Sequence, residues 1–392
     1  MTGLSTAARM QRLGTETAFE VLAHAEALAR QGKDIINLGI GQPDFKTPQH
    51  IVEAAIRALR EGHHGYTPAP GIPVLREAVS ADLQTRHGVQ VDPDRVVVVP
   101  GGKVTMNFAI TMFGEPGVEI LYPNPGFPIY ESMINFSGAT AVPYALLEEE
   151  GFAFDAPALL ALVNDNTRLI ILNSPANPTG GVVPKAVVEE LVEGLLRFPN
   201  VAILSDEIYS CMLFDGQQHV SLLQYPELAE RVIMLDGWSK TYAMTGWRLG
   251  YAVWPEALVE HATRLAVNCH SCVNASAQYA GLAALQGDQT AVVEMVQAFD
   301  ARRSVVVEGL NAIDGVSCQM PGGAFYVFPN VTATGQTSKS LQERLLEKDG
   351  VATIAGTSFG AYGEGYLRIS YASSLENIKT ALQRIRASID AL

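Results

Sequence analysis

The chain has little cysteine and no long hydrophobic run. Its 392 residues contain only four cysteines, Cys211, Cys269, Cys272 and Cys318, which are too few for a disulfide framework in a chain of this length. Cys269 and Cys272 are spaced C-x-x-C, but no second pair of this kind completes a zinc site, so we expect free thiols. No apolar run approaches the roughly 18 residues of a membrane span, and we expect no transmembrane segment.

The sequence also lacks a basic excess and an apolar leader. Lys and Arg number 27 against 41 Asp and Glu, a formal net charge of −14. This charge argues against a nucleic-acid surface, which needs a basic stripe. The first residues include arginines but no apolar stretch, so we expect a cytoplasmic rather than a secreted protein. His63 and His64 have no second ligand pair at a zinc-like spacing, and no metal site is predicted.

Apolar, β-branched runs alternate with helical patterns through the middle of the chain. The runs predict strands at residues 95–100, 119–123, 168–175, 201–207, 231–236 and 249–254. Strands that are apolar throughout, rather than at every second residue, are typical of a parallel sheet with helices on both faces. We therefore predict an α/β protein whose large domain, residues 48–290, contains a mostly parallel sheet covered by helices.

The two ends of the chain have a different character. Residues 322–331 and 366–372 predict strands that are richer in aromatic residues, and residues 332–340 predict a polar loop. Residues 374–392 predict an amphipathic helix that begins with a capping box from Ser373 and Glu376. We expect residues 1–47 and 291–392 to form a smaller α/β domain together.

Polar and aromatic residues follow the predicted strands of the large domain. In chain order they are Gly101, Gly102 and Lys103, then Phe127, Asn177, Asp206, Tyr209, Ser239, Lys240 and Arg248. The carboxyl ends of the strands in an open parallel sheet are where ligands bind, so we expect these residues to line one site. A lysine at the end of a buried run, such as Lys240, is costly unless its charge is paired or its amine reacts.

This set of groups suits a flat ring that carries a phosphate, a basic nitrogen and an electrophilic carbonyl. Two glycines at the start of a helix let backbone N–H groups approach a phosphate, and an arginine binds it bidentately. A lysine amine forms a Schiff base with an aldehyde, and a carboxylate keeps a pyridine nitrogen protonated, so that the ring withdraws electrons. The set therefore predicts pyridoxal 5′-phosphate as the cofactor.

Eight motifs, taken together, carry a resemblance to a known family. From residue 38 to residue 374 they are LGIGQPDFKTP, YTPAPGIPVLREAV, PGGKVTMNFAI, NSPANPTGG, SDEIY, SKTYAMTGWRLGY, GGAFYVFP and YLRISYASS. The chain resembles the class I and II aminotransferases, which are fold type I pyridoxal-phosphate enzymes, and is similar to the aspartate aminotransferases among them. The resemblance implies a homodimer that moves an amino group between an L-amino acid and a 2-oxo acid by a ping-pong mechanism.

The resemblance also implies roles for the residues that would contact the cofactor ring. Lys240 is similar to the family lysine that forms the Schiff base and later carries the proton. Asp206 would pair with the pyridine nitrogen, and Asn177 and Tyr209 would contact the ring hydroxyl. Phe127 would stack on the ring. Burial near cationic groups would lower the pKa of Lys240 and so favour the neutral amine that proton transfer requires.

The remaining implied contacts hold the phosphate and the substrate. The phosphate would be bound by Gly101, Gly102, Lys103, Ser239, Arg248 and, from the neighbouring subunit, Tyr66. Many relatives carry a serine at the position of Gly237, so this phosphate contact of the family is missing here, and Ser239 is a candidate to replace it. Arg368 would bind the α-carboxylate of the substrate, beside the backbone of Gly41 and the side chains of Phe127 and Asn177.

Other functions share parts of the pattern. A lyase or decarboxylase on the same scaffold would use the same cofactor, and a pyridoxal-phosphate sensor fused to a transcription regulator would bind it without turnover. The sensor needs a DNA-binding module, for which the first 47 residues leave no room. The side chain of the amino donor and the preferred 2-oxo acid stay open. A dicarboxylate would need a second cation, for which Arg12, Lys103 and His270 are candidates.

Overall fold

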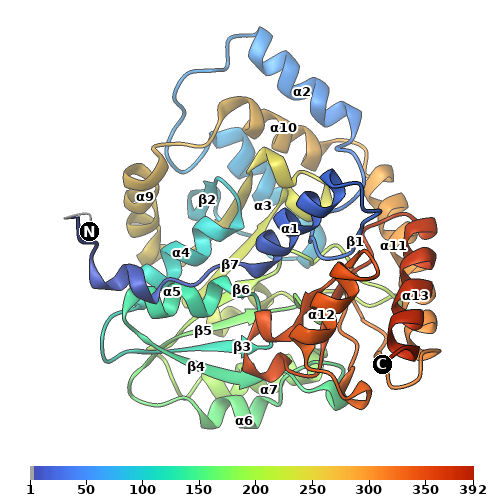
Figure 1. Cartoon of the computed structure of the whole chain (residues 1–392). Coiled ribbons are helices and arrows are strands. Elements are labelled where there is room, and N and C mark those ends of the chain that lie inside the picture. The colour runs from blue at the N-terminus through green and yellow to red at the C-terminus, as the bar shows by residue number, and fades with distance from the viewer. Residues whose placement is uncertain (1–3) are drawn as a thin grey trace.

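A seven-stranded sheet forms the centre of the computed structural model, which describes residues 4–392 (Figure 1). Its strands, in spatial order, are β2 (Val96–Val99), β8 (Gly250–Val253), β7 (Val232–Gly237), β6 (Ala202–Asp206), β5 (Thr167–Asn173), β3 (Glu119–Asn124) and β4 (Thr140–Ala145). Neighbouring strands run parallel except β8, which is antiparallel to both β2 and β7. The predicted α/β fold with a mostly parallel sheet is confirmed.

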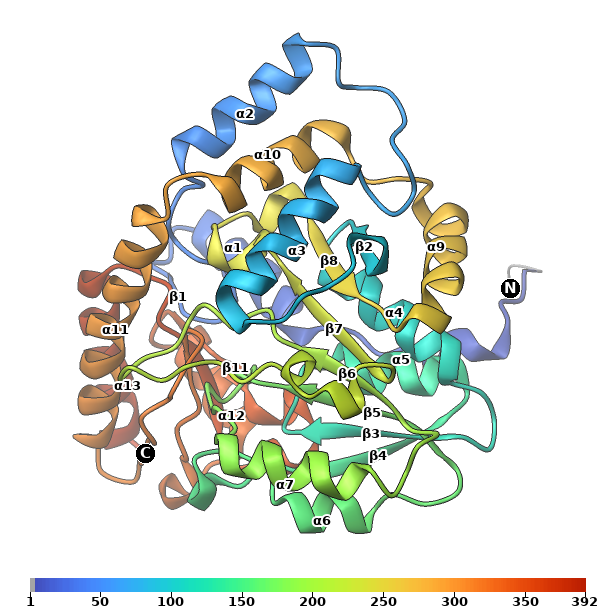
Figure 2. The same ribbon diagram turned by 180° about the vertical axis from the view of Figure 1, so that it is seen from behind.

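Both faces of this sheet are buried, which explains why its strands are apolar throughout. Val97 and Val99 of β2 pack on one face with α4 (Gly102–Phe113), α5 (Ile129–Ser137) and α9 (Glu256–His270). Val96 and Val98 point to the other face because successive side chains of a strand alternate. The helices on that face are α3 (Pro73–His87), α6 (Ala156–Ala161), α7 (Lys185–Leu195) and α10 (Ala275–Gln286) (Figure 2).

Segments from the two ends of the chain share a separate hydrophobic core. β1 (Ile36–Asn37) pairs in parallel with β10 (Val351–Ala352), and β12 (Leu367–Ser370) lies between β11 (Ile354–Ala355) and β9 (Tyr326–Val327). The helices of this core are α11 (Thr290–Asn311), α12 (Ser338–Glu347) and α13 (Leu375–Asp390). α1 (Thr17–Arg30) contacts β10 and β11. The division at residues 47 and 290 into two domains stays a prediction.

The structure differs from the sequence-based expectation at three places. The edge strand β4 was not predicted, because Pro143 interrupts its pattern, yet an edge strand tolerates a residue without an N–H donor. Ser374, not Ser373, caps α13 by accepting a hydrogen bond from the Asn377 backbone. Part of the predicted polar loop is helical, because Thr337 caps α12.

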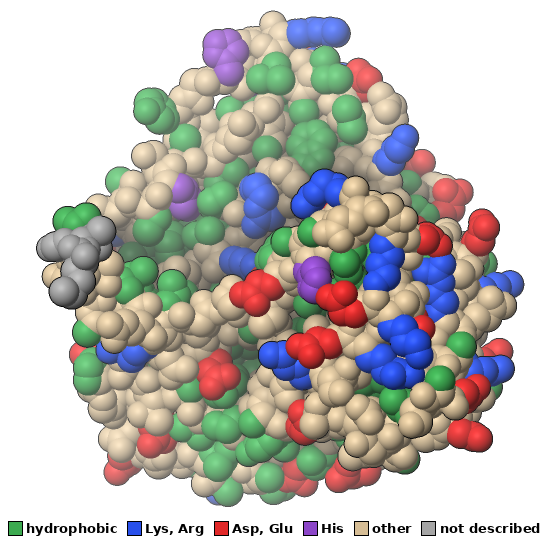
Figure 3. All heavy atoms as spheres, viewed as in Figure 1, with side chains coloured by type: hydrophobic (Ala, Val, Ile, Leu, Met, Phe, Trp, Pro, Cys, Tyr) green, Lys and Arg blue, Asp and Glu red, His purple; other side chains and the backbone are tan. Residues whose placement is uncertain are grey.

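One further helix, α2 (Gln49–Arg60), packs on α10 and lies at the outer edge of the molecule in both ribbon views (Figures 1 and 2). Acidic and basic side chains are interspersed on the face shown in Figure 3. No helix within residues 4–392 combines the length and the apolar character that a bilayer span requires.

Candidate functional site

A cleft of about 490 Å³ opens at the carboxyl ends of the parallel strands. The surface in Figure 3 is recessed beside α1, and Lys and Arg side chains line the recess. Segments distant in sequence meet in the cleft, including the ends of β5, β6 and β7, the first turn of α4, and β12. The predicted site residues that line it are Gly41, Gly102, Lys103, Phe127, Asn177, Asp206, Tyr209, Ser239, Lys240, Arg248 and Arg368.

Lys240 projects into the cleft from α8 (Trp238–Thr241), a short helix that directly follows β7. Its Nζ donates a hydrogen bond of 2.5 Å to the carbonyl oxygen of Gly41. The same Nζ lies 5.8 Å from the ring centroid of Tyr209. Burial, followed by the positive charge of Arg368, lowers the pKa of Lys240 to about 8. The amine is therefore far easier to deprotonate than an ordinary lysine.

Asp206 is a buried carboxylate at the end of β6, with 3% of its surface exposed. The hydroxyl of Tyr130 donates a 2.6 Å hydrogen bond to its Oδ2, and the Ile208 backbone donates to Oδ1 at 3.3 Å. Burial raises the pKa of Asp206 to about 6 despite these hydrogen bonds. A cation placed against this carboxylate would recover part of the cost of burying it.

Tyr209 lies one turn beyond Asp206, and its hydroxyl is 2.8 Å from the hydroxyl of Tyr326. Burial, with the Tyr326 hydroxyl beside it, raises the pKa of Tyr209 well above its ordinary value. Tyr326 also explains the glycine at position 41, because a Cβ there would lie 2.2 Å from the Tyr326 hydroxyl oxygen. The sequence motifs contained Tyr326, but its side chain was not predicted to reach the site.

Arg368 is buried in β12 and points into the cleft. Its Nη1 donates a 2.9 Å hydrogen bond to Oδ1 of Asn177, and its Nη2 donates to the Gly39 carbonyl. The guanidinium lies 4.7 Å from the ring centroids of both Tyr326 and Phe359. Within the described chain its Nε has no hydrogen-bond partner, although it is buried. Burial lowers the pKa of Arg368, so an anion in the cleft would be a favourable partner.

The first turn of α4 and Arg248 form a cradle for an anion. Gly101 has a φ of +93° and lies so close to Arg248 that a Cβ would be 2.1 Å from Nη2. Arg248 itself has a φ of +56°, and its Nη1 donates to the Thr245 carbonyl at 2.8 Å. The free N–H groups at the start of a helix attract phosphate, as does a guanidinium beside them.

The glycine at position 237 has a packing reason. Its backbone is extended, so no unusual torsion requires glycine. A Cβ there would lie 2.8 Å from the Cα of Gly250 on the neighbouring strand β8. A Cβ on Gly250 would in turn lie 2.9 Å from the backbone nitrogen of Gly102. Three backbones are thus stacked without side chains, and a serine at position 237 does not fit this packing.

Two predicted phosphate contacts lie differently from the expectation. Lys103 is on the first turn of α4, but its Nζ forms an ion pair with Glu16 and lies 5.3 Å from the ring centroid of Phe127. Tyr66 is 94% exposed, in the segment between α2 and α3, and does not line the cleft of its own chain. Gly101 adjoins the cleft through Arg248 rather than lining it.

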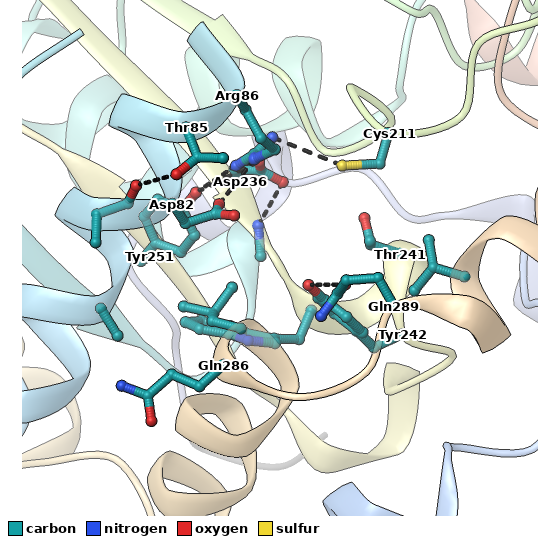
Figure 4. Close-up of a pocket in the computed structure, with 16 residues that line it drawn as sticks. Asp82, Thr85, Arg86, Cys211, Asp236, Thr241, Tyr242, Tyr251, Gln286 and Gln289 are labelled. Atoms are coloured by element: carbon teal, nitrogen blue, oxygen red, sulfur yellow. Dashed lines mark hydrogen bonds and ion pairs between the residues drawn. The ribbon is translucent and has the colours of Figure 1, made fainter. Parts of the chain in front are cut away.

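A second cavity, of about 380 Å³, lies on the other side of the segment that bears the lysine (Figure 4). Gly237, Trp238 and Thr241 line this rear cavity, whereas Ser239 and Lys240 line the cleft. Figure 4 shows Arg86 of α3 beside Asp236 on its wall. Sequence reasoning missed Arg86, because nothing local distinguishes it from a surface arginine of an amphipathic helix.

The Arg86 guanidinium has a partner for each of its nitrogens. Nε donates to Asp82 at 2.7 Å, and Nη2 donates at 3.1 Å to both Asp236 and the Tyr251 hydroxyl. Nη1 donates to Ser210 at 3.1 Å. No group of three or more His, Cys, Asp or Glu side chains suited to a metal ion occurs among residues 4–392.

The sequence has close relatives of known family. Residues 33–385 match the family model for aminotransferase class I and II. An aspartate aminotransferase from Pyrococcus horikoshii is 39% identical, with 92% of each chain covered. The crystal structure of the aspartate aminotransferase from Rhizobium meliloti has a TM-score of 0.95 at 35% identity and covers 99% of both chains. An alanine aminotransferase from Pyrococcus furiosus has a TM-score of 0.92 at 32% identity, covering 99% of this chain and all of that one.

Proposed function

The chain belongs to the class I and II aminotransferase family, and from this membership and the cleft we propose that it uses pyridoxal 5′-phosphate bound at Lys240. Amino acids and 2-oxo acids are its substrates. The meeting of Lys240, Asp206, Arg248 and Arg368 in one cleft is the observation that carries the proposal. Burial also lowers the pKa of Lys240 to about 8. Only a neutral amine can attack an aldehyde or accept a proton, and a lysine of ordinary pKa is almost entirely charged at neutral pH.

The groups in the cleft fit the cofactor. Gly101 and Gly102 with Arg248 would hold its phosphate, and Ser239, which also lines the cleft, would add a hydroxyl donor. The buried carboxylate of Asp206 would hold the ring nitrogen in its protonated form. When bound, pyridoxal phosphate supplies a carbonyl carbon for the amino group and a ring that withdraws electrons from the reacting carbon.

Arg368 would orient the substrate. Its buried guanidinium, with Nε unpartnered, offers charge and a free donor to the α-carboxylate. Asn177 holds Nη1 and so fixes the plane of the guanidinium. The Gly41 carbonyl accepts a hydrogen bond from Lys240 and lines the cleft, where its backbone would contact the substrate. Phe127 and Tyr209 would flank the ring, and Phe127 packs edge-on against Tyr130, which holds Asp206.

Lys240 would then move the proton. Its neutral Nζ would accept the proton from the α-carbon of the bound amino acid and release it again later. The amino group would stay with the enzyme when the first 2-oxo acid leaves, before the second 2-oxo acid enters. Ping-pong kinetics follow from this order. Burial, followed by the positive charge of Arg368, lowers the pKa of Lys240, so Nζ would release the proton more readily than an ordinary lysine.

We also propose that the protein acts as a homodimer. Tyr66 is a large aromatic residue that is 94% exposed and far from packing partners of its own chain. Such exposure is unusual for tyrosine and is explained if its hydroxyl reaches the phosphate in the partner's cleft. A lyase on the same scaffold stays the second candidate for the reaction, and a cytoplasmic location stays a prediction.

The central test replaces the lysine. Lys240→Ala should lower transamination by about four orders of magnitude or more, because no other amine lines the site at that position. Borohydride reduction in the presence of pyridoxal phosphate should label the Lys240 peptide of the natural chain, read by mass spectrometry, and leave the variant unlabelled there. Formation of a new amino acid from the second 2-oxo acid, without release of ammonia, separates transamination from a lyase reaction.

Lys185→Ala is the matched control. Lys185 is exposed on α7, and its one ion pair among the described residues is with Glu189 one turn away, so its loss should change neither the labelling nor the rate. Circular dichroism should show that both variants keep the fold. Near-normal turnover by Lys240→Ala would refute the assignment.

A further inference from the structure

The second cation that a dicarboxylate substrate would require can be sought among the basic residues of the cleft. These are Lys103, Lys240, Arg248 and Arg368. Under the proposed function Lys240 reacts, Arg368 binds the α-carboxylate and Arg248 faces the phosphate. Arg12 and His270 do not line the cleft, since Arg12 is bound to the Asn135 and Phe136 carbonyls and His270 stacks on Phe108. Among the described residues of this chain that line the cleft, Lys103 is the basic residue that is left.

Lys103 is already paired with an acid inside the cleft. Its Nζ forms an ion pair with Glu16, which precedes α1 and also lines the cleft. The Glu16 carboxylate caps no backbone N–H of α1, so the described residues offer Lys103 as its principal partner. The N-terminal end of a helix also favours a negative charge at this position. The Lys103 ammonium and the N-terminal end of α1 therefore both stabilise the negative charge of Glu16.

The negative charge of Glu16 reaches the reacting groups. Burial lowers the pKa of both Lys240 and Arg368, and the negative charge of Glu16 opposes this lowering in each. Apart from Asp206, Glu16 is the only acidic side chain among the described residues that line the cleft. A carboxylate on the substrate side chain would have to share Lys103 with Glu16 or displace it, and in either case would lie beside a second carboxylate. Such like-charge contacts reject a ligand.

The walls around the pair are apolar. Phe19 and Phe127 flank Lys103, whose Nζ lies 5.4 and 5.3 Å from their ring centroids. Ile40, Met106 and Ile208 line the same cleft. The stem of Lys103 and the two aromatic rings present hydrocarbon surface to a substrate, with the charge of the pair cancelled.

We propose that the Glu16–Lys103 pair makes this enzyme select amino donors and 2-oxo acids with uncharged, apolar or aromatic side chains and reject those with a side-chain carboxylate. This inference rests on the proposed function and names its substrate class. Glu16 acts as a specificity residue by occupying Lys103, the basic side chain of this chain's cleft to which the proposed function gives no other role.

The test compares two donors on one acceptor. With pyruvate as the acceptor and pyridoxal phosphate saturating, the natural enzyme should show a kcat/KM for leucine at least about tenfold above that for aspartate. Glu16→Gln keeps the shape of the side chain but releases Lys103, so the aspartate-to-leucine ratio of kcat/KM should rise by at least about tenfold. Adding Lys103→Met to Glu16→Gln should remove that gain, because the freed cation is then absent.

Glu20→Gln is the matched control, since Glu20 is an exposed acid of α1 that does not line the cleft. It should leave the ratio unchanged. A natural enzyme that prefers aspartate, or a Glu16→Gln ratio that stays level or falls, overturns the inference while leaving aminotransfer intact. Absence of turnover with every donor, combined with absence of borohydride labelling at Lys240, overturns the proposed function and the inference together.

Discussion

The cleft and the rear cavity lie on opposite sides of residues 236–240, and both contain buried charge. In the rear cavity each nitrogen of Arg86 donates to an oxygen of the protein, including the carboxylates of Asp82 and Asp236. In the cleft, Lys240 has only the neutral carbonyl of Gly41 as its acceptor, and Nε of Arg368 has no partner among the described residues. The charged groups of both regions are buried, but those of the rear cavity have hydrogen-bond partners for all their donors and, among the described residues, those of the cleft do not.

The ionisation of the two regions differs for the same reason. Burial alone would lower the pKa of Arg86, but Tyr251 and the carboxylates of Asp236 and Asp82 raise it overall. Burial lowers the pKa of Lys240 as well, and the neighbouring cations lower it further. A buried charged group whose donors all have acceptors in the protein has a structural role, and removing one of its partners destabilises the fold. A buried charged group without such partners is available to bind a ligand. The comparison assigns a structural role to the rear cavity and a chemical one to the cleft.

The largest expected effect concerns the carboxylate of the cleft. Asp206→Asn should lower kcat about a thousandfold, because an amide cannot hold the ring nitrogen in its protonated form. Steady-state transamination of leucine with pyruvate measures the loss. Tyr130→Phe, which removes a hydrogen bond to Asp206 but keeps its charge, should cost about tenfold or less. Equal losses in the two variants would contradict the proposed role of the charge.

The second largest effect should be a loss of stability when the buried cation of the rear cavity is removed. Arg86→Met should lower the free energy of unfolding by about 3 kcal/mol, because Asp236 would be buried without its partner. Chemical denaturation measures this loss. Arg264→Met, in an exposed ion pair of α9 with Glu260, should change stability by less than about 0.5 kcal/mol. The folded Arg86→Met enzyme should keep kcat within about threefold of the natural enzyme, since Arg86 does not line the cleft.

The smallest expected effect concerns the cleft, where the charge of Lys240 should lower the stability of the folded protein. The folded pKa of Lys240, about 8, lies below its ordinary value of 10.5, so charging this lysine costs stability. In the cofactor-free protein, Lys240→Met should raise the free energy of unfolding at pH 7 by about 2 kcal/mol. That gain should shrink as the pH rises through 8 toward 10.5, where the lysine is neutral when folded. A gain that does not vary with pH would show that the charge is not responsible.

Sequence patterns were sufficient for the fold and for the ends of the strands. The apolar runs that became β6 and β7 placed Asp206 and Lys240 at strand ends, and a parallel sheet brings such ends to one edge. Because both faces of the sheet are buried, the central strands are apolar at every residue and can be recognised in the sequence. The edge strand β4 left no such signal, because Pro143 sits in a strand that is paired on one side only.

Other features depended on contacts between residues distant in the chain. Tyr130 reaches Asp206 over 76 positions, Arg86 reaches Asp236 over 150, and Lys103 reaches Glu16 over 87. No local pattern reports such a pair, because each member has the spacing of an ordinary helix or loop residue. The sequence by itself determined the sheet, the order in which polar residues follow its strands, and the types of side chain that are available at the site. Only the tertiary structure decided which charges found partners, because pairing and desolvation depend on distances that arise when separate segments pack together.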